Sequence, residues 1–133
     1  MTDTTPKAIS IADALAGRPM LDGRRPDTPA EEASAAFATL ADFREGSIFT
    51  GRFRGESPWE RHRMGDELVH ILDGATTLTI VTDDGPVDLD LKTGMLTVVP
   101  QGCWHRFKSA DGVTVLTATP QPTDHTTELP PGA

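Results

Sequence analysis

From about residue 47 onward, apolar and polar residues alternate with a period of two, and short groups of turn residues interrupt the alternation. Successive side chains of a β-strand point to opposite faces, so this period predicts strands. In the clearest segment Glu67, Val69 and Ile71 share one face, and the residues between them share the other. Strands that recur about every 8–12 residues with turns between them are typical of an antiparallel sandwich or barrel.

Turn residues set the limits of the predicted strands. Asp73-Gly74 predicts a hairpin, and Asp84-Gly85-Pro86 predicts another turn that leads into the alternating segment 87–91. Asp111-Gly112 is predicted to end one strand before the last one, Val113 to Thr119, begins. The barrel is therefore expected to span residues 46–120.

The first 45 residues follow a different pattern and predict a short, partly helical arm on the outside of the barrel. Ser10 with Asp13 predicts a capped helix that ends at Gly17, and Pro29 predicts the start of a second helix. The alanine-rich stretch 32–41 could continue this helix or turn into a strand, and both alternatives stay open.

Two segments are expected to lack regular structure. Residues 17–29 contain too many glycines and prolines for a helix or strand. Residues 121–133 are polar and proline-rich, which predicts a flexible tail that frays. The chain is thus divided into an arm (1–45), a barrel (46–120) and a tail (121–133).

Size, charge and cysteine content narrow the function classes. At 133 residues the chain has room for one core but not two, and its net charge of −8 argues against nucleic-acid binding. The lone Cys103 cannot form an internal disulfide, and no segment has the apolar length of a secretion signal or a membrane span. We therefore expect a soluble cytoplasmic protein that binds neither nucleic acid nor membrane.

Four residues in the barrel region are candidate metal ligands. Glu60 and His62 lie two apart, so they share one face of a strand, and Glu67 opens the next strand. A barrel could bring His105, far along the chain, beside these three. Carboxylates converging with imidazoles in an apolar interior need a cation, and nitrogen and oxygen donors without thiolate suit Fe, Mn, Ni or Zn.

Two motifs give the sequence a resemblance to a known family, the cupins. The cupin pattern G(X)5HXH(X)3,4E(X)6G is matched at its end by His62, Glu67 and Gly74. The second cupin pattern, G(X)5PXG(X)2H(X)3N, is matched with full spacing up to its histidine, and Ser109 replaces the final asparagine; the matching residues are Gly94, Pro100, Gly102 and His105. The motifs cover residues 60–109, and the strand pattern extends the resemblance from about 47 to 119.

The resemblance implies an all-β fold, an antiparallel double-stranded β-helix or jelly-roll barrel, and a homodimer. It also implies a divalent metal bound in the barrel, with Glu60 in the place of the first histidine of the motif. We expect Glu60 to bind the metal directly, together with His62, Glu67 and His105. The alternative is that Glu60 faces solvent and pairs with Arg61 or Arg63, which would leave three ligands.

Other polar and aromatic residues have simpler interpretations. His70 is interpreted as a packed or interface histidine, and Cys103 as a small buried apolar residue or part of the pocket mouth. His125 falls in the tail and is expected to be inert. Trp59 and Trp104 alternate with the candidate ligands, so they are expected on the outer face, against the arm or a second subunit.

Two function hypotheses from different classes follow. The first is a metal-dependent enzyme that acts on a small organic molecule, with dioxygenase, isomerase or lyase chemistry. The second is a non-catalytic module that binds a small molecule or a metal, or acts as a sensor. We favour the enzyme, because no DNA-binding segment accompanies the barrel as a regulator would require.

Overall fold

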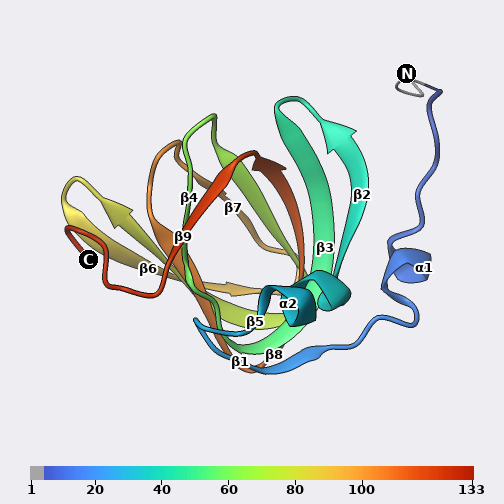
Figure 1. Cartoon of the computed structure of the whole chain (residues 1–133), viewed down its shortest axis with the longest axis horizontal. Helices are drawn as coiled ribbons and strands as arrows, with labels where there is room; N and C mark the ends of the chain where they lie inside the picture. Colours follow the sequence, from blue (N-terminus) through green and yellow to red (C-terminus); the bar gives the residue numbers. More distant parts are fainter. Residues whose placement is uncertain (1–4) are drawn as a thin grey trace.

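Strands dominate the computed structural model, which describes residues 5–133 and shows a sheet curled around a central space (Figure 1). The elements in chain order are α1 (Ile11–Leu15), β1 (Leu21–Arg24), α2 (Ala30–Ala36), β2 (Phe37–Phe43), β3 (Gly46–Glu56), β4 (Trp59–His62), β5 (Glu67–Thr82), β6 (Gly85–Lys92), β7 (Leu96–Val99), β8 (His105–Pro120) and β9 (Thr123–Thr126). The β-barrel class expected from the period-two pattern is confirmed.

Two 16-residue strands, β5 and β8, run antiparallel to each other and form the centre of the sheet. The predicted hairpin at Asp73-Gly74 is wrong, because β5 continues through it, and β8 likewise continues through Asp111-Gly112. Gly74 has φ +86° and Gly112 has φ +105°, and a Cβ on Gly74 would collide with the Gly112 carbonyl oxygen. Each glycine therefore bends its strand at the point where the backbones of β5 and β8 approach closely, and neither glycine forms a hairpin turn.

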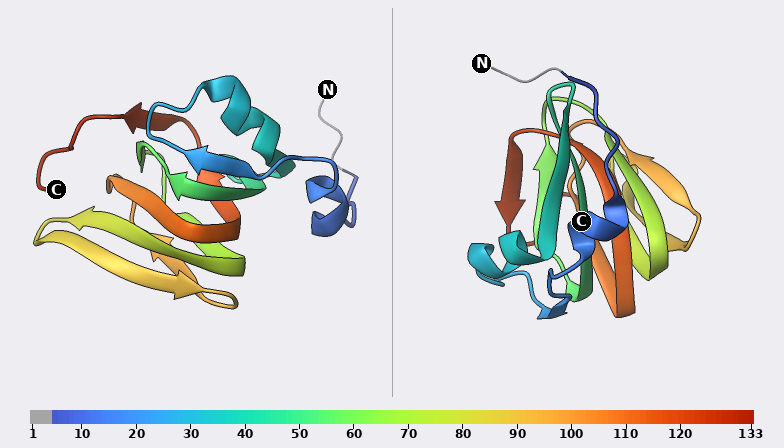
Figure 2. Two further views of the ribbon diagram at one scale, coloured as in Figure 1. Left: turned by 90° about the horizontal axis from the view of Figure 1, so that it is seen from below. Right: turned by 90° about the vertical axis from the view of Figure 1, so that its right-hand side faces the viewer.

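The long strands divide the sheet into two halves that curl toward each other (Figure 2). The first half of β5 pairs with β7 and its second half with β6, across the tight turn after Thr82 that the sequence predicts. The other edge of β8 pairs with β3 and, at His105, with β4. All of these pairs are antiparallel, and β2 adds a further antiparallel strand beside β3.

The N-terminal region is more regular than expected. The Ser10 cap is present, with the Asp13 amide donating to Ser10 Oγ at 3.1 Å. The alanine-rich stretch realises both alternatives, since α2 ends at Ala36 and β2 begins at Phe37. The segment 17–29, predicted to be irregular, contains β1, which pairs with β3 in parallel and not antiparallel as expected for the barrel.

The C-terminal segment also forms a strand instead of fraying. Residues Thr123–Thr126 form β9 and pair antiparallel with β4, whose contact with β8 is a single residue pair. β9 thereby covers an edge of β4 that would otherwise expose unpaired backbone groups. The division into arm, barrel and tail stays a prediction, and residues 1–4 of the arm lie outside the described residues.

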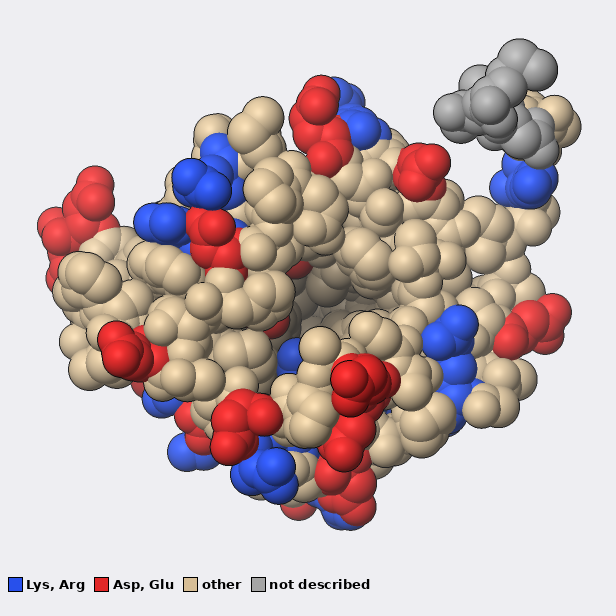
Figure 3. Space-filling view, viewed as in Figure 1, with Lys and Arg blue, Asp and Glu red and all other residues tan. Residues whose placement is uncertain are grey.

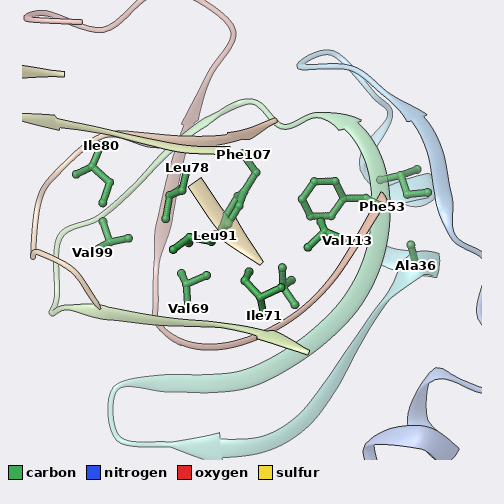
Figure 4. Packing of buried hydrophobic residues seen from close by; sticks show 12 residues of the cluster. Ala36, Phe53, Val69, Ile71, Leu78, Ile80, Leu91, Val99, Phe107 and Val113 are labelled. Atoms are coloured by element: carbon green, nitrogen blue, oxygen red, sulfur yellow. The ribbon is translucent and has the colours of Figure 1, made fainter. Parts of the chain in front are cut away.

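Apolar side chains fill the space between the two halves of the sheet (Figure 4). Phe53 from β3 and Phe107 from β8 meet edge to face at 5.8 Å, and each buried side chain of this size contributes about 1.5–3 kcal/mol. Phe107 is followed toward the start of β8 by His105, whose ring lies 6.4 Å away. The core therefore ends directly beside the polar residues of the candidate site. No helix within residues 5–133 is long and apolar enough to span a membrane.

Candidate metal centre

Three strands bring the four candidate ligands to one place inside the barrel. β4 carries Glu60 and His62, β5 begins at Glu67, and β8 begins at His105, which pairs directly with Glu60. His62, Glu67 and His105 are 3%, 4% and 1% exposed, so the alternation predicts correctly that they point inward. Residues two to forty-five positions apart in the sequence thus converge because the barrel closes β4 onto β8.

Glu67 lies between the two imidazoles. Its Oε2 is 3.2 Å from His62 Nε2, and its Oε1 is 3.1 Å from His105 Nε2. The two rings are 5.1 Å apart, centroid to centroid. One carboxylate oxygen of Glu60 and one nitrogen of each histidine all lie within 4.8 Å of one another. Glu60, His62 and His105 therefore surround one small volume, and Glu67 contacts both imidazoles.

Hydrogen bonds to their outer nitrogens orient both histidines. His105 Nδ1 lies 3.0 Å from the Cys103 carbonyl oxygen, which can only accept, so the proton of the neutral ring is on Nδ1. His62 Nδ1 lies 3.0 Å from Thr123 Oγ1, and this hydroxyl accepts from Nδ1 when it donates to Gln121 Oε1, 3.4 Å away. Both Nε2 atoms then carry a lone pair that points inward, the arrangement in which protein histidines bind metals.

A hydroxyl orients the carboxylate in the same way. Thr119 Oγ1 donates to Glu67 Oε2 at 2.6 Å and is itself 2.8 Å from Thr117 Oγ1. This threonine pair belongs to β8, so the strand that supplies His105 also fixes Glu67. The site is thus held by partners around the four candidate ligands as well as by the strands.

The donor atoms fit a divalent metal ion. His62 Nε2, His105 Nε2 and Glu67 Oε1 are buried, and apart from the contacts between the imidazoles and Glu67 they have no partner among the described residues. Leaving such a group unpaired costs about 1–3 kcal/mol, which a bound cation removes. Separations of 3.1 and 3.2 Å suit neighbouring ligands around an ion whose bonds are about 2.1 Å long.

The same contacts shift the ionisation of two of these groups. Burial raises the pKa of Glu67, but the imidazoles of His105 and His62 outweigh it and lower this pKa from 4.5 to about 2. Burial lowers the pKa of His105, but the Glu67 carboxylate outweighs it and raises this pKa above 6.5. In the metal-free protein, a proton on His105 therefore takes the place that a cation would fill.

We predict that metal-free and metal-loaded protein respond to pH in opposite directions. The raised pKa of His105 gives the metal-free protein stability that is complete below pH 6.5 and is lost as the pH rises through the folded-state pKa. The lowered pKa of Glu67 gives stability above pH 4.5 that is lost as the pH falls toward 2. Melting temperatures with chelator should thus fall as the pH rises above 6.5, whereas the gain in melting temperature from added metal should grow over the same range. Parallel curves with and without metal would contradict this prediction.

A cavity of about 420 Å³ opens beside the candidate ligands, and Figure 3 shows a hollow near the centre of one face. Glu60 and Glu67 line one part of the cavity, and the rings of Phe49, Phe53 and Phe107 line another. A mainly apolar cavity with a few convergent polar groups is the usual form of a small-molecule site.

The ion pair with Arg61 or Arg63 that the surface alternative for Glu60 requires is absent among the described residues, and binding of a metal by Glu60 stays a prediction. Arg61 and Arg63 both bind Asp124 of β9, at 3.0 and 2.9 Å, and neither pairs with Glu60 among the described residues. His125 Nε2 lies 4.0 Å from Glu60 Oε2, and the Glu60 carboxylate also acts on Arg24 and His105. His125 was expected to sit in a fraying tail, but β9 holds it at the wall of the cavity.

The remaining candidates lie outside the site. Trp59 and Trp104 face away from the ligands, as predicted, but arginines of the same chain cover them: Arg106 stacks on Trp59 at 4.7 Å and Arg61 on Trp104 at 4.6 Å. His70 is half-buried on the opposite face of β5. The half-buried Cys103 packs against the core, which raises the pKa of its thiol, and its carbonyl oxygen, not its sulfur, serves the site.

Sequence reasoning missed three residues that bear on the site. Thr119 was visible as an inward polar position on a strand otherwise rich in valine, which is a usable signal. Thr123 lies in the segment expected to fray, and Arg24 lies in the segment expected to be irregular. No local pattern distinguishes these two, because strand pairing alone brings them to the cavity.

Comparison with known proteins agrees with the geometry. The Cupin domain family matches residues 53–118. An acireductone dioxygenase of Rhodopseudomonas palustris is 33% identical over 106 residues, covering 76% of this chain; the chain spans only 53% of that relative's length.

Two solved structures share the fold. A cupin-2 domain protein from Shewanella frigidimarina has a TM-score of 0.53 at 16% identity, covering 68% of this chain and 80% of that one. The hydroquinone 1,2-dioxygenase of Sphingomonas sp. TTNP3, with 4-hydroxybenzoate bound, has a TM-score of 0.53 at 18% identity. The match covers 69% of this chain and 67% of that one. With the two sequence motifs, the curled sheet and the inward histidines, these matches establish that the chain belongs to the cupin superfamily.

Proposed function

We propose that the protein is a metal-dependent enzyme that acts on a small organic molecule, with dioxygenase chemistry as the first class to test. The observation that carries this proposal is the set of three buried, unpartnered donor atoms of His62, His105 and Glu67 beside a cavity of about 420 Å³. Glu60 completes the proposed ligand set. Fe, Mn, Ni and Zn all suit these donors, and a bound ion of this kind would supply a Lewis acid and, if redox-active, a site for O₂.

The residues of the chain would perform three tasks in such a reaction. The Cys103 carbonyl and Thr123 hold the two imidazoles with their lone pairs directed inward, and Thr119 holds the Glu67 carboxylate. The aromatic rings that line the cavity exclude water and bind an apolar part of the substrate. Preorganised groups of this kind lower a reaction barrier because they need no rearrangement when the substrate binds.

The dioxygenase class rests on sequence relatives. Acireductone dioxygenases from two strains of Rhodopseudomonas palustris are 32% and 33% identical, and for the second of these the aligned part covers 76% of this chain. Since the chain spans only 53% of that protein, its substrate is a starting point for a screen and not an assignment.

The test is an oxygen-uptake screen on protein reconstituted separately with Fe(II), Mn(II), Ni(II) and Zn(II) under anaerobic conditions. Acireductone and hydroquinone are the first substrates, and the His105→Ala variant is the control. We expect oxygen uptake with at least one redox-active metal, lost in the variant. Protein that binds metal and small molecules, yet consumes neither substrate nor oxygen across a wider panel, would instead support a non-catalytic binding module.

Substitutions of Glu60 test whether it is a ligand. We expect Glu60→Gln to weaken metal binding by roughly 10-fold, because it removes charge but keeps an oxygen, and Glu60→His to restore binding and favour softer ions. The measurement is metal affinity by competition with a chelating dye. If Glu60→Gln and Glu60→Ala bind metal as tightly as the wild type, Glu60 is not a ligand and the site has three.

We propose that the protein forms a homodimer through the outer face of β7 and β5. Leu96 and Val98 of β7 are 60% and 49% exposed, and Val98 pairs with Leu68 beside them. An apolar strand face of this kind is commonly covered in solution. Light scattering should give about twice the 14.3 kDa chain mass, and Val98→Asp should halve it. A monomer mass for the wild type at micromolar concentration would refute the dimer.

A further inference from the structure

Arg24 is the residue of the cavity wall that neither the fold nor the proposed metal centre explains. It ends β1 and lines the 420 Å³ cavity together with Glu60 and Glu67. It also lines a neighbouring cleft of about 640 Å³, so its guanidinium borders two open spaces. Its place in the fold is constrained, because β1 pairs with β3 at Gly55, where a Cβ would collide with the Arg24 backbone.

The planar face of the Arg24 guanidinium stacks on aromatic rings, and its N–H groups have no acceptor among the described residues. It stacks on the ring of Phe53 at 4.7 Å and on that of Phe37 at 5.4 Å. Stacking uses the planar face of a guanidinium and leaves its five N–H donors in the plane for other partners. Among residues 5–133, no side chain or carbonyl forms a hydrogen bond or ion pair with these donors.

The other half-buried arginines do not share this property. Each of them has a hydrogen-bond acceptor within the protein: Arg18 and Arg52 bind backbone carbonyls, Arg61 binds Asp124, and Arg106 binds Glu56. Arginines that serve packing in this fold therefore have protein acceptors. Arg24 is half-buried in the same way, yet it lacks a protein acceptor among the described residues and lines the cavity, where a bound molecule can supply one.

Charge balance indicates what this molecule is. This step rests on the proposed metal centre: a divalent ion is neutralised by the carboxylates of Glu60 and Glu67, which leaves the charge of Arg24 unbalanced. Burial lowers the pKa of Arg24, and the Glu60 carboxylate opposes this shift but does not outweigh it. Removing water from this cation is therefore unfavourable unless a further anion replaces it, above all when Glu60 holds a metal. A monoanion would bring the cavity to neutrality.

We propose that Arg24 recognises the carboxylate of a small organic acid whose apolar body packs against the phenylalanines of the cavity. A carboxylate matches the edge of a guanidinium, since its two oxygens accept two parallel N–H bonds. Phe49, Phe53 and Phe107 line the space that remains for an aromatic or branched aliphatic group. Arg24 is thus a recognition residue that sets the substrate class, and the arm strand β1 supplies it.

The test compares acids with their uncharged amides. Benzoate, phenylacetate and 3-methylbutanoate, each paired with its amide, are titrated into metal-loaded and metal-free protein by calorimetry, with metal content measured in every sample. We expect the metal-loaded wild type to bind at least one acid roughly 10-fold or more tighter than its amide, the size expected of a charged hydrogen-bond pair. Arg24→Gln should lose this preference and keep its metal, and Arg24→Lys should retain a reduced preference.

The matched control is Arg25→Gln, because Arg25 is the exposed neighbour that pairs with Asp27 at 3.1 Å. It should bind acids as the wild type does. Equal affinity for acids and amides, no binding of any acid, or a preference that survives in Arg24→Gln would each overturn the proposal. If Arg24→Gln does not fold, Arg24→Lys provides the test. A preference for acids over amides as strong in Arg24→Lys as in the wild type would overturn the proposal. Acid preference through Arg24 in protein that takes up no metal would refute the metal centre and leave the anion site standing.

Discussion

Replacing His105 with alanine is expected to empty the metal site. His105 is 1% exposed, and its Nε2 is one of the unpartnered donors at the centre of the cluster. Losing a residue that merely orients a ligand typically costs 10–100-fold in metal affinity, so we expect a loss above about 100-fold when a ligand itself is removed. His62→Ala should behave in the same way. Metal content by mass spectrometry should fall from about one ion per chain to background, and chelator should no longer change the melting temperature.

His70→Ala is the matched control for this loss. His70 is another strand histidine, half-buried where His105 is fully buried, and it lies on the opposite face of β5 from Glu67. The control should retain metal and its chelator-sensitive melting temperature. Metal that stays bound in a folded His105→Ala variant, or disappears equally in His70→Ala, would contradict the assignment of the centre.

Replacing Gly74 with alanine, which adds one methyl group, is expected to destabilise the protein strongly. The residue has φ +86°, and its new Cβ would meet the backbone of Gly112 and Val113 on β8. We expect the free energy of unfolding to fall by about 3 kcal/mol or more, the sum of backbone strain and the separation of two paired strands. Urea unfolding of the metal-free protein measures this loss without a contribution from bound metal.

Gly94→Ala separates the two causes. Gly94 has nearly the same φ, +88°, but nothing lies within 4 Å of the added Cβ. Backbone strain alone should lower the free energy of unfolding of the Gly94→Ala variant by about 1 kcal/mol. If Gly74→Ala is no more destabilising than Gly94→Ala, β5 and β8 do not approach each other closely at this bend.

The sequence predicts the barrel and the inward direction of the candidate ligands because both depend on local alternation. His62, Glu67 and His105 each occupy the inward phase of a strand, and the motif spacing places those strands correctly. Alternation is a property of neighbouring residues, so it can be read without knowing which strands pair.

Features that depend on pairing between distant segments could not be predicted in this way. Asp73-Gly74 has the sequence of a hairpin turn, and only the approach of Gly112 shows that its glycine serves a bend within a strand. β9 is a strand because β4 offers it a free edge, although its own composition is that of a flexible tail. Arg24 reaches the cavity because Gly55 admits the backbone of β1.

The central claim is that one divalent ion lies between His62, Glu67 and His105, with Glu60 as the fourth protein ligand. The most direct test is a crystal structure of protein loaded with Mn(II) or Fe(II), with diffraction data collected on both sides of the absorption edge of the metal. The account predicts one strong anomalous peak about 2.1 Å from His62 Nε2 and His105 Nε2, with carboxylate oxygens of Glu67 and Glu60 also in its coordination sphere. A peak elsewhere on the protein, or no peak in crystals grown with excess metal, would contradict it.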